Sequence, residues 1–344
     1  MAERTRVAVL AGGRSSEHEI SLASARSVLE SLNPERYDVV TVAIGRDGRW
    51  EIGPGNPHGP SNKVLQGRSV AETLPVPAAD APAALGAVDV VLPILHGPFG
   101  EDGTVQGLLE LADVAYVGAG VAASALCMDK DLFKKVLRES GIRVARSVTL
   151  RTGDEVAHPY DYPVFVKPAR LGSSVGITKA HDEDELRAGV ELAFRHDEKI
   201  LIEEFLDGIE VEVGVLGNLD PIASLPGQIV PLGHEWYDYA SKYDEGGMKL
   251  VIPPDELSDE TLARVQDAAV DAFRVTDCEG MARVDCFVVN GDVVVNELNT
   301  IPGFTATSVY AKLFEASGTP YERLLERLIA LALERHERRS KLKY

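Results

Sequence analysis

The chain is poor in cysteine and has no long apolar run. Its three cysteines, Cys127, Cys278 and Cys286, show no zinc-motif spacing and sit among apolar residues. We therefore expect free thiols in a reducing compartment. The short apolar run near the N-terminus, VAVLAGG, is too brief for a signal peptide or a spanning helix. These absences predict a cytoplasmic protein with no membrane partner.

Basic residues are also outnumbered. Lys and Arg total 35 against 54 Asp and Glu, which gives a formal net charge of -19. This excess of negative charge repels phosphate backbones and argues against nucleic acid as a partner. It fits an anionic substrate only if lysines and arginines gather in a cleft. The 344 residues are too many for one ordinary domain, so we expect two or three.

Two glycine-rich segments lack the full pattern of the common nucleotide loops. A buried strand ends in two glycines and leads to a helix, with its N-cap expected at Ser15 or Ser16 and with Glu19 in its first turn. The third glycine of a dinucleotide fingerprint is missing, which argues against a Rossmann cofactor site. The loop at 172–176 leads to a strand, so it is not a P-loop, yet its small residues let backbone N–H groups approach phosphates.

Two strand-like runs flank Asn290-Gly291, which is a strong hairpin signal. Both runs should be buried, yet they carry Asp285, Glu297 and Asn299. Buried carboxylates are costly unless they are paired or bind a metal. Oxygen ligands suit Mg²⁺ or Mn²⁺, which needs only one or two carboxylates plus phosphate oxygens. The loop NTIPG that follows offers backbone N–H groups to an anion and favours a site over a solvated hairpin.

The register of this hairpin tests the metal hypothesis. A two-residue turn would pair Asp285 with Asn296 and turn Glu297 to the opposite face. A three-residue loop at 290–292 with a bulge would pair Asp285 with Glu297 instead. We predict the second register.

Lysines and long loops mark further parts of the site. Lys167 ends an otherwise apolar strand just before the 172–176 loop. Lys130 follows the expected N-cap Asp129, where a cation opposes the helix dipole unless it serves another purpose. A long loop with aromatic residues is expected at 227–253, and with the 172–176 loop it is our candidate for a closing lid. Residues 53–82, rich in Pro, Gly and Ala, predict a loop-like insertion.

Seven motifs in order make the chain resemble the D-alanine–D-alanine ligase family of ATP-grasp carboxylate–amine ligases. They are SSEHEISL, LHGPFGEDGTVQG, MDKDLFK, KPARLGSSVG, LIEEFLDGIEVEV, WYDYASKY and RVDCFVVNGDVVVNELNTIPGFTATS. The resemblance covers nearly the whole chain. It implies an α/β and α+β fold in three domains: an open parallel α/β domain at 1–128, a central ATP-grasp domain at 129–221 and a C-terminal ATP-grasp domain at 222–344.

The resemblance also implies a reaction. ATP would phosphorylate the carboxylate of one D-alanine, and the amine of a second would attack the acyl phosphate. The products would be D-alanyl-D-alanine for peptidoglycan synthesis, ADP and phosphate. ATP, D-alanine and two Mg²⁺ (or Mn²⁺) ions are the expected ligands, and a homodimer is the expected assembly.

Carried over position by position, the resemblance assigns residues to each part of the site. The expected nucleotide contacts are Lys130, Lys167, Ser174, Glu203, Glu204, Leu206 and Glu210. The expected metal ligands are Asp285, Glu297 and Asn299. The expected catalytic residues are the hydrogen-bonded triad Glu19, Ser173 and Tyr243, with Arg283 and the Gly303 N–H as oxyanion donors. The expected contacts to the two D-alanines are His96, Lys242, Ser308 and Val309.

Two alternatives stay open. A ligase that takes D-lactate or D-serine second would share these motifs, although Tyr243 argues against D-lactate, because the resemblance puts phenylalanine or a different loop in enzymes that form the ester. A non-catalytic nucleotide-binding protein on the same scaffold should lose its metal ligands or oxyanion donors first. Here Asp285, Glu297, Asn299 and Arg283 are all present.

Overall fold

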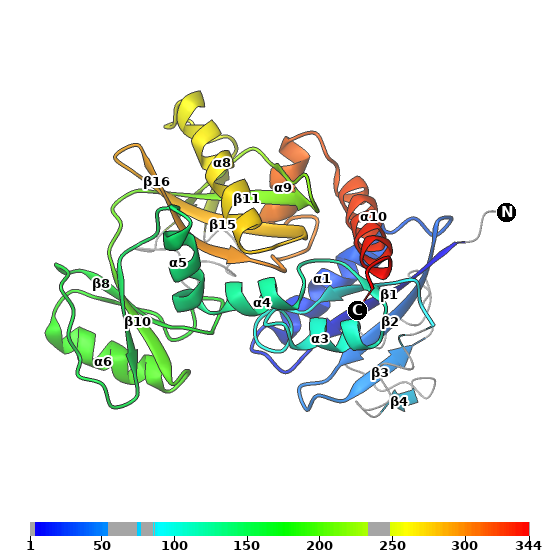
Figure 1. Ribbon diagram of the computed structural model, residues 1–344, viewed down its shortest axis with the longest axis horizontal. Coiled ribbons are helices and arrows are strands. Elements are labelled where there is room, and N and C mark those ends of the chain that lie inside the picture. Colours follow the sequence, from blue (N-terminus) through cyan, green and yellow to red (C-terminus); the bar gives the residue numbers. More distant parts are fainter. Residues whose placement is uncertain (1–3, 54–73, 77–84, 86, 233–247, 344) are drawn as a thin grey trace.

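Three sheets follow one another along the chain (Figure 1). The computed structural model describes residues 4–53, 74–76, 85, 87–232 and 248–343. The mixture of one largely parallel sheet and two antiparallel sheets agrees with the predicted α/β and α+β class. Within the described ranges, no helix is both long and apolar enough to cross a membrane.

The first sheet has six strands in the order β4-β3-β2-β1-β5-β6. β1 pairs in parallel with β2 and β5, and β5 pairs in parallel with β6, as an open parallel domain requires. Val7, Val9 and Leu10 of β1 are fully buried, because a parallel strand is covered on both faces. The elements are β1 (Thr5–Gly12), α1 (His18–Ser31), β2 (Tyr37–Ile44), β3 (Trp50–Gly53), β4 (Leu74–Val76), β5 (Val90–Ile94), α3 (Thr104–Leu111) and β6 (Ala115–Tyr116).

Two local predictions in this domain need correction. The expected insertion at 53–82 contains the strand β4, which pairs with β3, and most of the remainder lies outside the described residues. The residue at the N-cap of α1 is Glu17, not Ser15 or Ser16. The Ser15 hydroxyl instead donates to the His96 carbonyl at 2.7 Å, so it ties the glycine turn to the end of β5.

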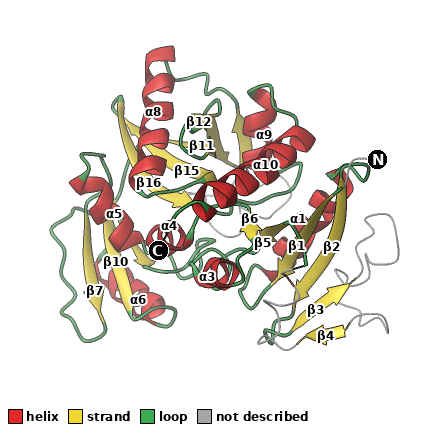
Figure 2. Ribbon diagram, turned by 45° about the vertical axis from the view of Figure 1, so that its right-hand side comes forward, coloured by secondary structure: helices red, strands yellow, loops and turns green. Residues whose placement is uncertain are grey.

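The second sheet is antiparallel, in the order β7-β10-β8-β9, and α6 covers one of its faces (Figure 2). Asp129 caps α5 as predicted, because its side chain accepts from the Leu132 N–H. Gly141 follows α5 at φ 77°, the left-handed conformation that ends many helices. The elements are α4 (Val121–Met128), α5 (Lys130–Glu139), β7 (Ser147–Arg151), β8 (Val164–Pro168), β9 (Thr178–Ala180), α6 (Glu183–Phe194) and β10 (Lys199–Glu204).

The third sheet runs in the order β14-β13-β11-β15-β16, with β12 beside β11. β13 and β14 occupy the two ends of the loop predicted at 227–253, and the centre of that loop lies outside the described residues. The elements are β11 (Ile209–Gly217), β12 (Ile222–Ala223), β13 (Gly227–Pro231), β14 (Met248–Val251), α8 (Asp259–Val275), β15 (Gly280–Val289), β16 (Asp292–Asn299), α9 (Val309–Ala316) and α10 (Tyr321–Ser340).

The position of β11 bears on the domain boundary. β11 lies in the range 129–221 that was expected to form the central domain, but its partners β12, β13 and β15 all belong to the third sheet. The chain therefore passes from the second sheet to the third between residues 204 and 209. We propose this crossing, and not residue 221, as the boundary between the central and C-terminal domains.

The β15–β16 hairpin has the predicted pairing of its two acids. Asp285 lies opposite Glu297. The turn, however, is the two-residue Asn290-Gly291 and not the predicted three-residue loop at 290–292. The predicted pairing of Asp285 with Glu297 is confirmed, but the three-residue loop predicted to cause it is wrong.

A bulge within the strands sets this register. Cys286 lies opposite Val295 while its neighbour Asp285 lies opposite Glu297, so Asn296 is the extra residue. A bulge of one residue reverses which face the following side chains take. It therefore brings Glu297 to the face of Asp285 despite the short turn.

The last helix joins the third domain to the first. α10 packs against β5, β6 and α1 (Figure 1). Its Leu324 and Leu328 share one buried cluster with Val9 and Leu92 of the first sheet. The N-terminal and C-terminal domains are thus packed on a common core, which fixes the walls they contribute to a cavity between them.

Candidate active site

Two cavities meet where the three domains converge. The first, about 410 Å³, lies between the second and third sheets and is called here the lysine chamber; its lining includes Lys130, Lys167, Glu203, Glu210 and Asn296. The second, about 360 Å³, lies between the first and third domains and is called the histidine chamber; its lining includes Glu17, His96, Glu101, Arg283 and Ser308. Gly172, Ser173 and Glu297 line both chambers.

Glu203 organises the charges of the lysine chamber. It is buried on β10, and its two carboxylate oxygens lie 2.6 Å from Lys167 Nζ and 3.2 Å from Lys134 Nζ. Burial alone would raise the pKa of Glu203, but the two lysine charges outweigh it and lower the pKa to about 2. The same contact raises the pKa of Lys167 against the effect of burial. Both groups are therefore charged near neutral pH.

Lys130 reaches the chamber from the first turn of α5. Its ammonium donates to the Leu171 carbonyl at 2.7 Å and lies 3.8 Å from Glu297 Oε2. One cation thus links the 172–176 loop to the hairpin. This second purpose explains a lysine in a position that the helix dipole disfavours.

The remaining predicted nucleotide contacts also line the lysine chamber. They are Ser174, Glu204, Leu206 and Glu210. The Glu204 carboxylate is engaged by Arg146, whose Nε lies 2.6 Å away, so the part of Glu204 suited to a ligand is its backbone. In the 172–176 loop, Ser173 and Ser174 have φ values of 52° and 56°, a conformation that turns successive N–H groups toward one side.

The hairpin brings its oxygen ligands together as predicted. Asp285 is buried and is held by Arg283 at 2.7 and 2.8 Å, and the Asn299 amide donates to it at 3.0 Å. Arg283 Nε also lies 3.0 Å from Glu212 Oε2, so two acids orient the guanidinium. In the described part of the chain, no group of three His, Cys, Asp or Glu side chains could hold a metal. Asp285, Glu297 and Asn299 offer two carboxylates and one amide, a set that suits Mg²⁺ only together with phosphate oxygens.

Glu17, and not Glu19, is the acid that contacts Ser173 in the histidine chamber. The Ser173 hydroxyl donates a short hydrogen bond to Glu17, which is buried. Glu19 points away, with its side chain 74% exposed and 3.1 Å from Arg46. The prediction of Glu19 is wrong because an acid in the first turn is typical of a helix start, whereas the acid that lines the chamber lies two residues earlier, at the N-cap.

His96 is buried at the wall between the first and third domains. Its Nδ1 lies 3.0 Å from the Ile301 carbonyl, which can only accept, so Nδ1 carries the proton and Nε2 presents a lone pair. Burial lowers the pKa of His96, which keeps the ring neutral. Nε2 is buried and has no hydrogen-bond partner among the described residues. It is therefore ready to accept from a ligand in the histidine chamber.

Glu101 is a site residue that the sequence reasoning missed. Its oxygens accept from the Gly97 N–H at 2.9 Å and the Ile301 N–H at 3.3 Å. Burial, with the nearby charge of Glu17, raises the pKa of Glu101 to about 8. Its position in the motif LHGPFGEDG, five residues after His96, was the available signal.

The other predicted substrate contacts fall into two groups. Gly303, Ser308 and Val309 line the histidine chamber, and the Ser308 hydroxyl accepts from the Thr305 N–H at 3.0 Å. Lys242 and Tyr243 lie outside the described residues.

Comparison with known proteins identifies the family. Two family models match the chain: "D-ala D-ala ligase N-terminus" at residues 6–119 and "D-ala D-ala ligase C-terminus" at residues 136–330. The curated D-alanine–D-alanine ligase A of Mesorhizobium japonicum is 46% identical over an alignment that covers 98% of this chain and 100% of that protein.

Solved structures agree. The D-alanine-D-alanine ligase from Coxiella burnetii superposes with a TM-score of 0.85 at 38% identity, covering 99% of this chain and 97% of that one. The VanG D-Ala:D-Ser ligase from Enterococcus faecalis has a TM-score of 0.83 at 36% identity, covering 96% and 100%. The chain has the ATP-grasp fold and belongs to the D-alanine–D-alanine ligase family of ATP-dependent ligases.

Proposed function

We propose that this protein uses ATP to join two D-alanine molecules into D-alanyl-D-alanine for peptidoglycan synthesis. One observation carries the proposal: the lysine chamber and the histidine chamber share a wall made of Gly172, Ser173 and Glu297. A nucleotide in the first chamber would bring its phosphates to this wall, and a carboxylate in the second would meet them there. That arrangement suits phosphoryl transfer, in which catalysis is mostly positioning and charge stabilisation.

The lysine chamber would take ATP. Lys130 and Lys167 would contact the phosphates, and Lys167 keeps its charge because Glu203 raises its pKa. Glu203 and backbone groups of Glu204 and Leu206 would face the adenine. The 172–176 loop, with Ser174, would cover the phosphates, and Glu210 would bind the ribose.

The hairpin would hold the cations. Asp285, Glu297 and Asn299 would bind two Mg²⁺ (or Mn²⁺) ions. When bound, such ions neutralise charge on the transferring phosphoryl group. The fit rests on the oxygen-only donor set and on the pairing of Asp285 with Glu297 at one face of the hairpin.

The first D-alanine would be held by its ammonium. Glu17 replaces Glu19 in this role and is oriented by Ser173. The lone pair of His96 Nε2 faces the same chamber and would accept a second ammonium proton. With the ammonium fixed, the carboxylate of this molecule would point at the γ-phosphate. Tyr243 stays a predicted third member of the Glu17–Ser173 group.

The second D-alanine would attack the acyl phosphate. Ser308, the Val309 N–H and the predicted Lys242 would bind its carboxylate. Its amine would form the new C–N bond, and the developing oxyanion would be stabilised by Arg283 and the Gly303 N–H. The amine must lose a proton, and phosphate leaves with the electrons of the broken C–O bond. The homodimer stays a prediction from the family resemblance, and the cytoplasmic location stays a prediction from the sequence.

Product analysis tests this function. The purified protein would be incubated with ATP, Mg²⁺ and D-alanine, and the products identified by mass spectrometry. We expect D-alanyl-D-alanine and one ADP per dipeptide, with neither formed from L-alanine. Equal mixtures of D-alanine with D-serine or D-lactate address the alternatives: a mixed dipeptide or an ester as the main product would replace the proposal, and ATP binding without turnover would refute it.

A further inference from the structure

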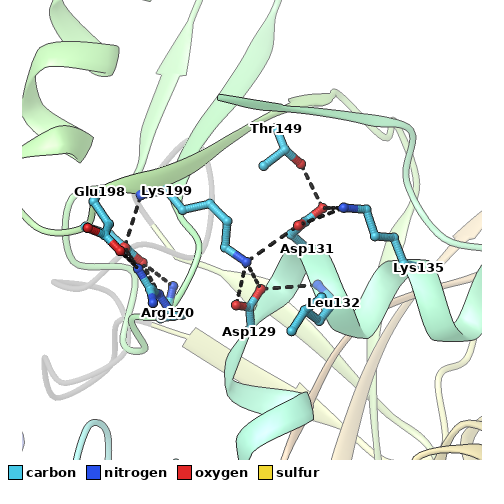
Figure 3. A network of polar contacts seen from close by, with 9 residues as sticks. Asp129, Asp131, Leu132, Lys135, Thr149, Arg170, Glu198 and Lys199 are labelled. Carbon is cyan, nitrogen blue, oxygen red and sulfur yellow. Dashed lines mark hydrogen bonds and ion pairs between the residues drawn. The ribbon is translucent and has the colours of Figure 1, made fainter. Parts of the chain in front are cut away.

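A network of charged side chains lies at the start of α5 (Figure 3). Lys199, at the start of β10, places its ammonium 2.6 Å from Asp129 Oδ1 and 3.5 Å from Asp131 Oδ2. Lys199, Asp129 and Asp131 are all buried, with 5%, 7% and 6% of their surface exposed. These two acids flank Lys130 in sequence, so the network encloses the start of α5.

Backbone hydrogen bonds carry this network to the phosphate loop. The Lys199 carbonyl accepts from the Ala169 N–H at 2.9 Å, and the Ala169 carbonyl accepts from the Lys130 N–H at 2.9 Å. The beginning of β10, the start of the 172–176 loop region and the beginning of α5 are thus bonded in series. The Asp129 carboxylate closes the arrangement, since it binds Lys199 and also caps α5 through the Leu132 N–H.

A second set of polar contacts, made by Asp197, fixes the residues just before the 172–176 loop. Asp197 accepts from the Arg170 N–H at 2.8 Å and from the Lys199 N–H at 3.1 Å, and its carboxylate also binds the Arg170 guanidinium. Burial opposes the charge of Asp197, but Arg170 and these N–H groups outweigh it and lower the pKa of Asp197. The residues just before the 172–176 loop are therefore held from two sides.

Charge accounts for the choice of a lysine at position 199. Asp129 and Asp131 would otherwise attract the neighbouring Lys130 ammonium or repel a phosphate. Lys199 neutralises Asp129, while Lys135 and Thr149 bind Asp131 at 2.9 and 2.8 Å. Lys130 instead extends to Leu171 and Glu297 at the shared wall. A buried ion pair adds little net stability, because desolvation offsets the attraction, so stability alone does not explain this one.

We propose that Lys199 and Asp129 are positioning residues for Lys130: their buried ion pair fixes the start of α5 and removes competing charge, so that the Lys130 ammonium is held for the phosphates of the nucleotide. This inference rests on the proposed function, in which Lys130 contacts ATP. Neither Lys199 nor Asp129 lines the lysine chamber, so both act through Lys130.

A double-mutant cycle on nucleotide binding tests the inference. The dissociation constant of Mg²⁺–ADP would be measured by calorimetry for the wild type, Lys199→Met, Lys130→Ala and the double variant. We expect Lys199→Met to weaken binding about 10- to 100-fold, as loss of a residue that orients a ligand group does. In the Lys130→Ala background the same substitution should have almost no further effect, because groups that act through one another are not additive. The KM for ATP should rise, and the KM for D-alanine should stay the same.

Asp129→Asn gives a second variant should Lys199→Met fail to fold. It keeps the oxygen that caps α5 and removes the charge, so it should show the same non-additivity with Lys130→Ala. Arg338→Met is the control, because it breaks an ion pair between Arg338 of α10 and Glu279, two residues that do not line the lysine chamber. It should lower the melting temperature without changing ADP affinity.

The outcomes separate the two proposals. If Lys130→Ala leaves ADP binding unchanged, the assignment of Lys130 to the nucleotide fails, and the positioning inference fails with it. If Lys130→Ala weakens binding but Lys199→Met has no effect, or keeps its full effect in the double variant, only the positioning inference is wrong.

Discussion

Glu203 is a buried glutamate and Glu101 a partly buried one in the adjacent chamber, and the pKa values of their carboxyl groups shift in opposite directions. Two lysine ammonium groups lie within 3.2 Å of Glu203, and they lower its pKa to about 2 despite burial. Glu101 accepts from two backbone N–H groups, and burial together with the charge of Glu17 raises its pKa to about 8. At neutral pH one acid is charged and the other is largely protonated.

The difference follows from what each chamber would bind. The lysine chamber keeps its cations charged by pairing them with Glu203, which suits a polyphosphate. The histidine chamber holds the acids Glu17, Glu101 and Glu297 close together, and one of them stays protonated to limit their repulsion. Neutral His96 adds no charge there. The second chamber is thus suited to a small ligand that carries both an ammonium and a carboxylate.

The largest effect is expected from removing one of the two cations that hold Glu203. Lys134→Met leaves a buried carboxylate with one partner, and we expect a loss of about 3–5 kcal/mol in the free energy of unfolding at pH 7. The stabilisation from Glu203 is present above its unfolded pKa and disappears as pH falls toward 2. The difference in the free energy of unfolding between the variant and the wild type should therefore shrink on acidification. Urea unfolding at pH 7 and pH 4 measures it.

Lys135→Met is the control for this experiment. Lys135 belongs to the same helix but its side chain is 59% exposed, so its ion pair with Asp131 should contribute about 1 kcal/mol or less. Equal losses for the two lysines would contradict the role given to Glu203.

A smaller effect is expected at Glu101, and here the free energy of unfolding should change with pH in the opposite direction. Its folded pKa of about 8 lies above the unfolded value, so the folded state binds the extra proton between these pKa values. Stability should then fall as pH rises, by about 1.4 kcal/mol per pH unit, or about 3 kcal/mol between pH 5 and pH 7. Glu101→Gln keeps the shape of the protonated side chain but cannot titrate. The free energy of unfolding of this variant, plotted against pH, should therefore lack this slope. Parallel curves for variant and wild type would show that Glu101 is charged in the folded protein.

The smallest predicted change separates the two acids at the start of α1. Glu17→Gln removes a charged partner of the first D-alanine ammonium, worth about 1.5–3 kcal/mol, so the KM for that molecule should rise about 10- to 100-fold. Glu19→Gln alters an exposed ion pair and should change KM and stability by less than about 0.5 kcal/mol. Steady-state kinetics at fixed ATP measures both; a larger effect at Glu19 would restore the original prediction.

The general plan of the site was predictable because it rests on local patterns. The hairpin acids, the lysine near the end of β8 and the capped lysine helix each follow from strand alternation, turn residues or capping, and the structure brings all three to one place. The change of sheet before β11 was not predictable in this way. Strand pairing between distant segments leaves no mark in a single run of alternating residues.

Two errors show what the patterns leave out. Glu19 fits a helix start, and only the path of the chain before α1 shows that Glu17 faces the chamber. The motif LHGPFGEDG marks the position of Glu101 but not its raised pKa, because that pKa comes from burial among groups that are far apart in sequence, such as Glu17 and Ile301.

The extra residue at Asn296 makes the two halves of β16 alternate out of phase. Side chains between the turn and Val295 follow one phase, and those from Glu297 onward follow the other. Removing two residues from the tip would therefore preserve the orientation of the acids. Deleting Asn296 alone would close the bulge, and Glu297 would then follow Val295 directly and still lie opposite Asp285. Both deletions are thus expected to leave the two acids on one face of the ribbon.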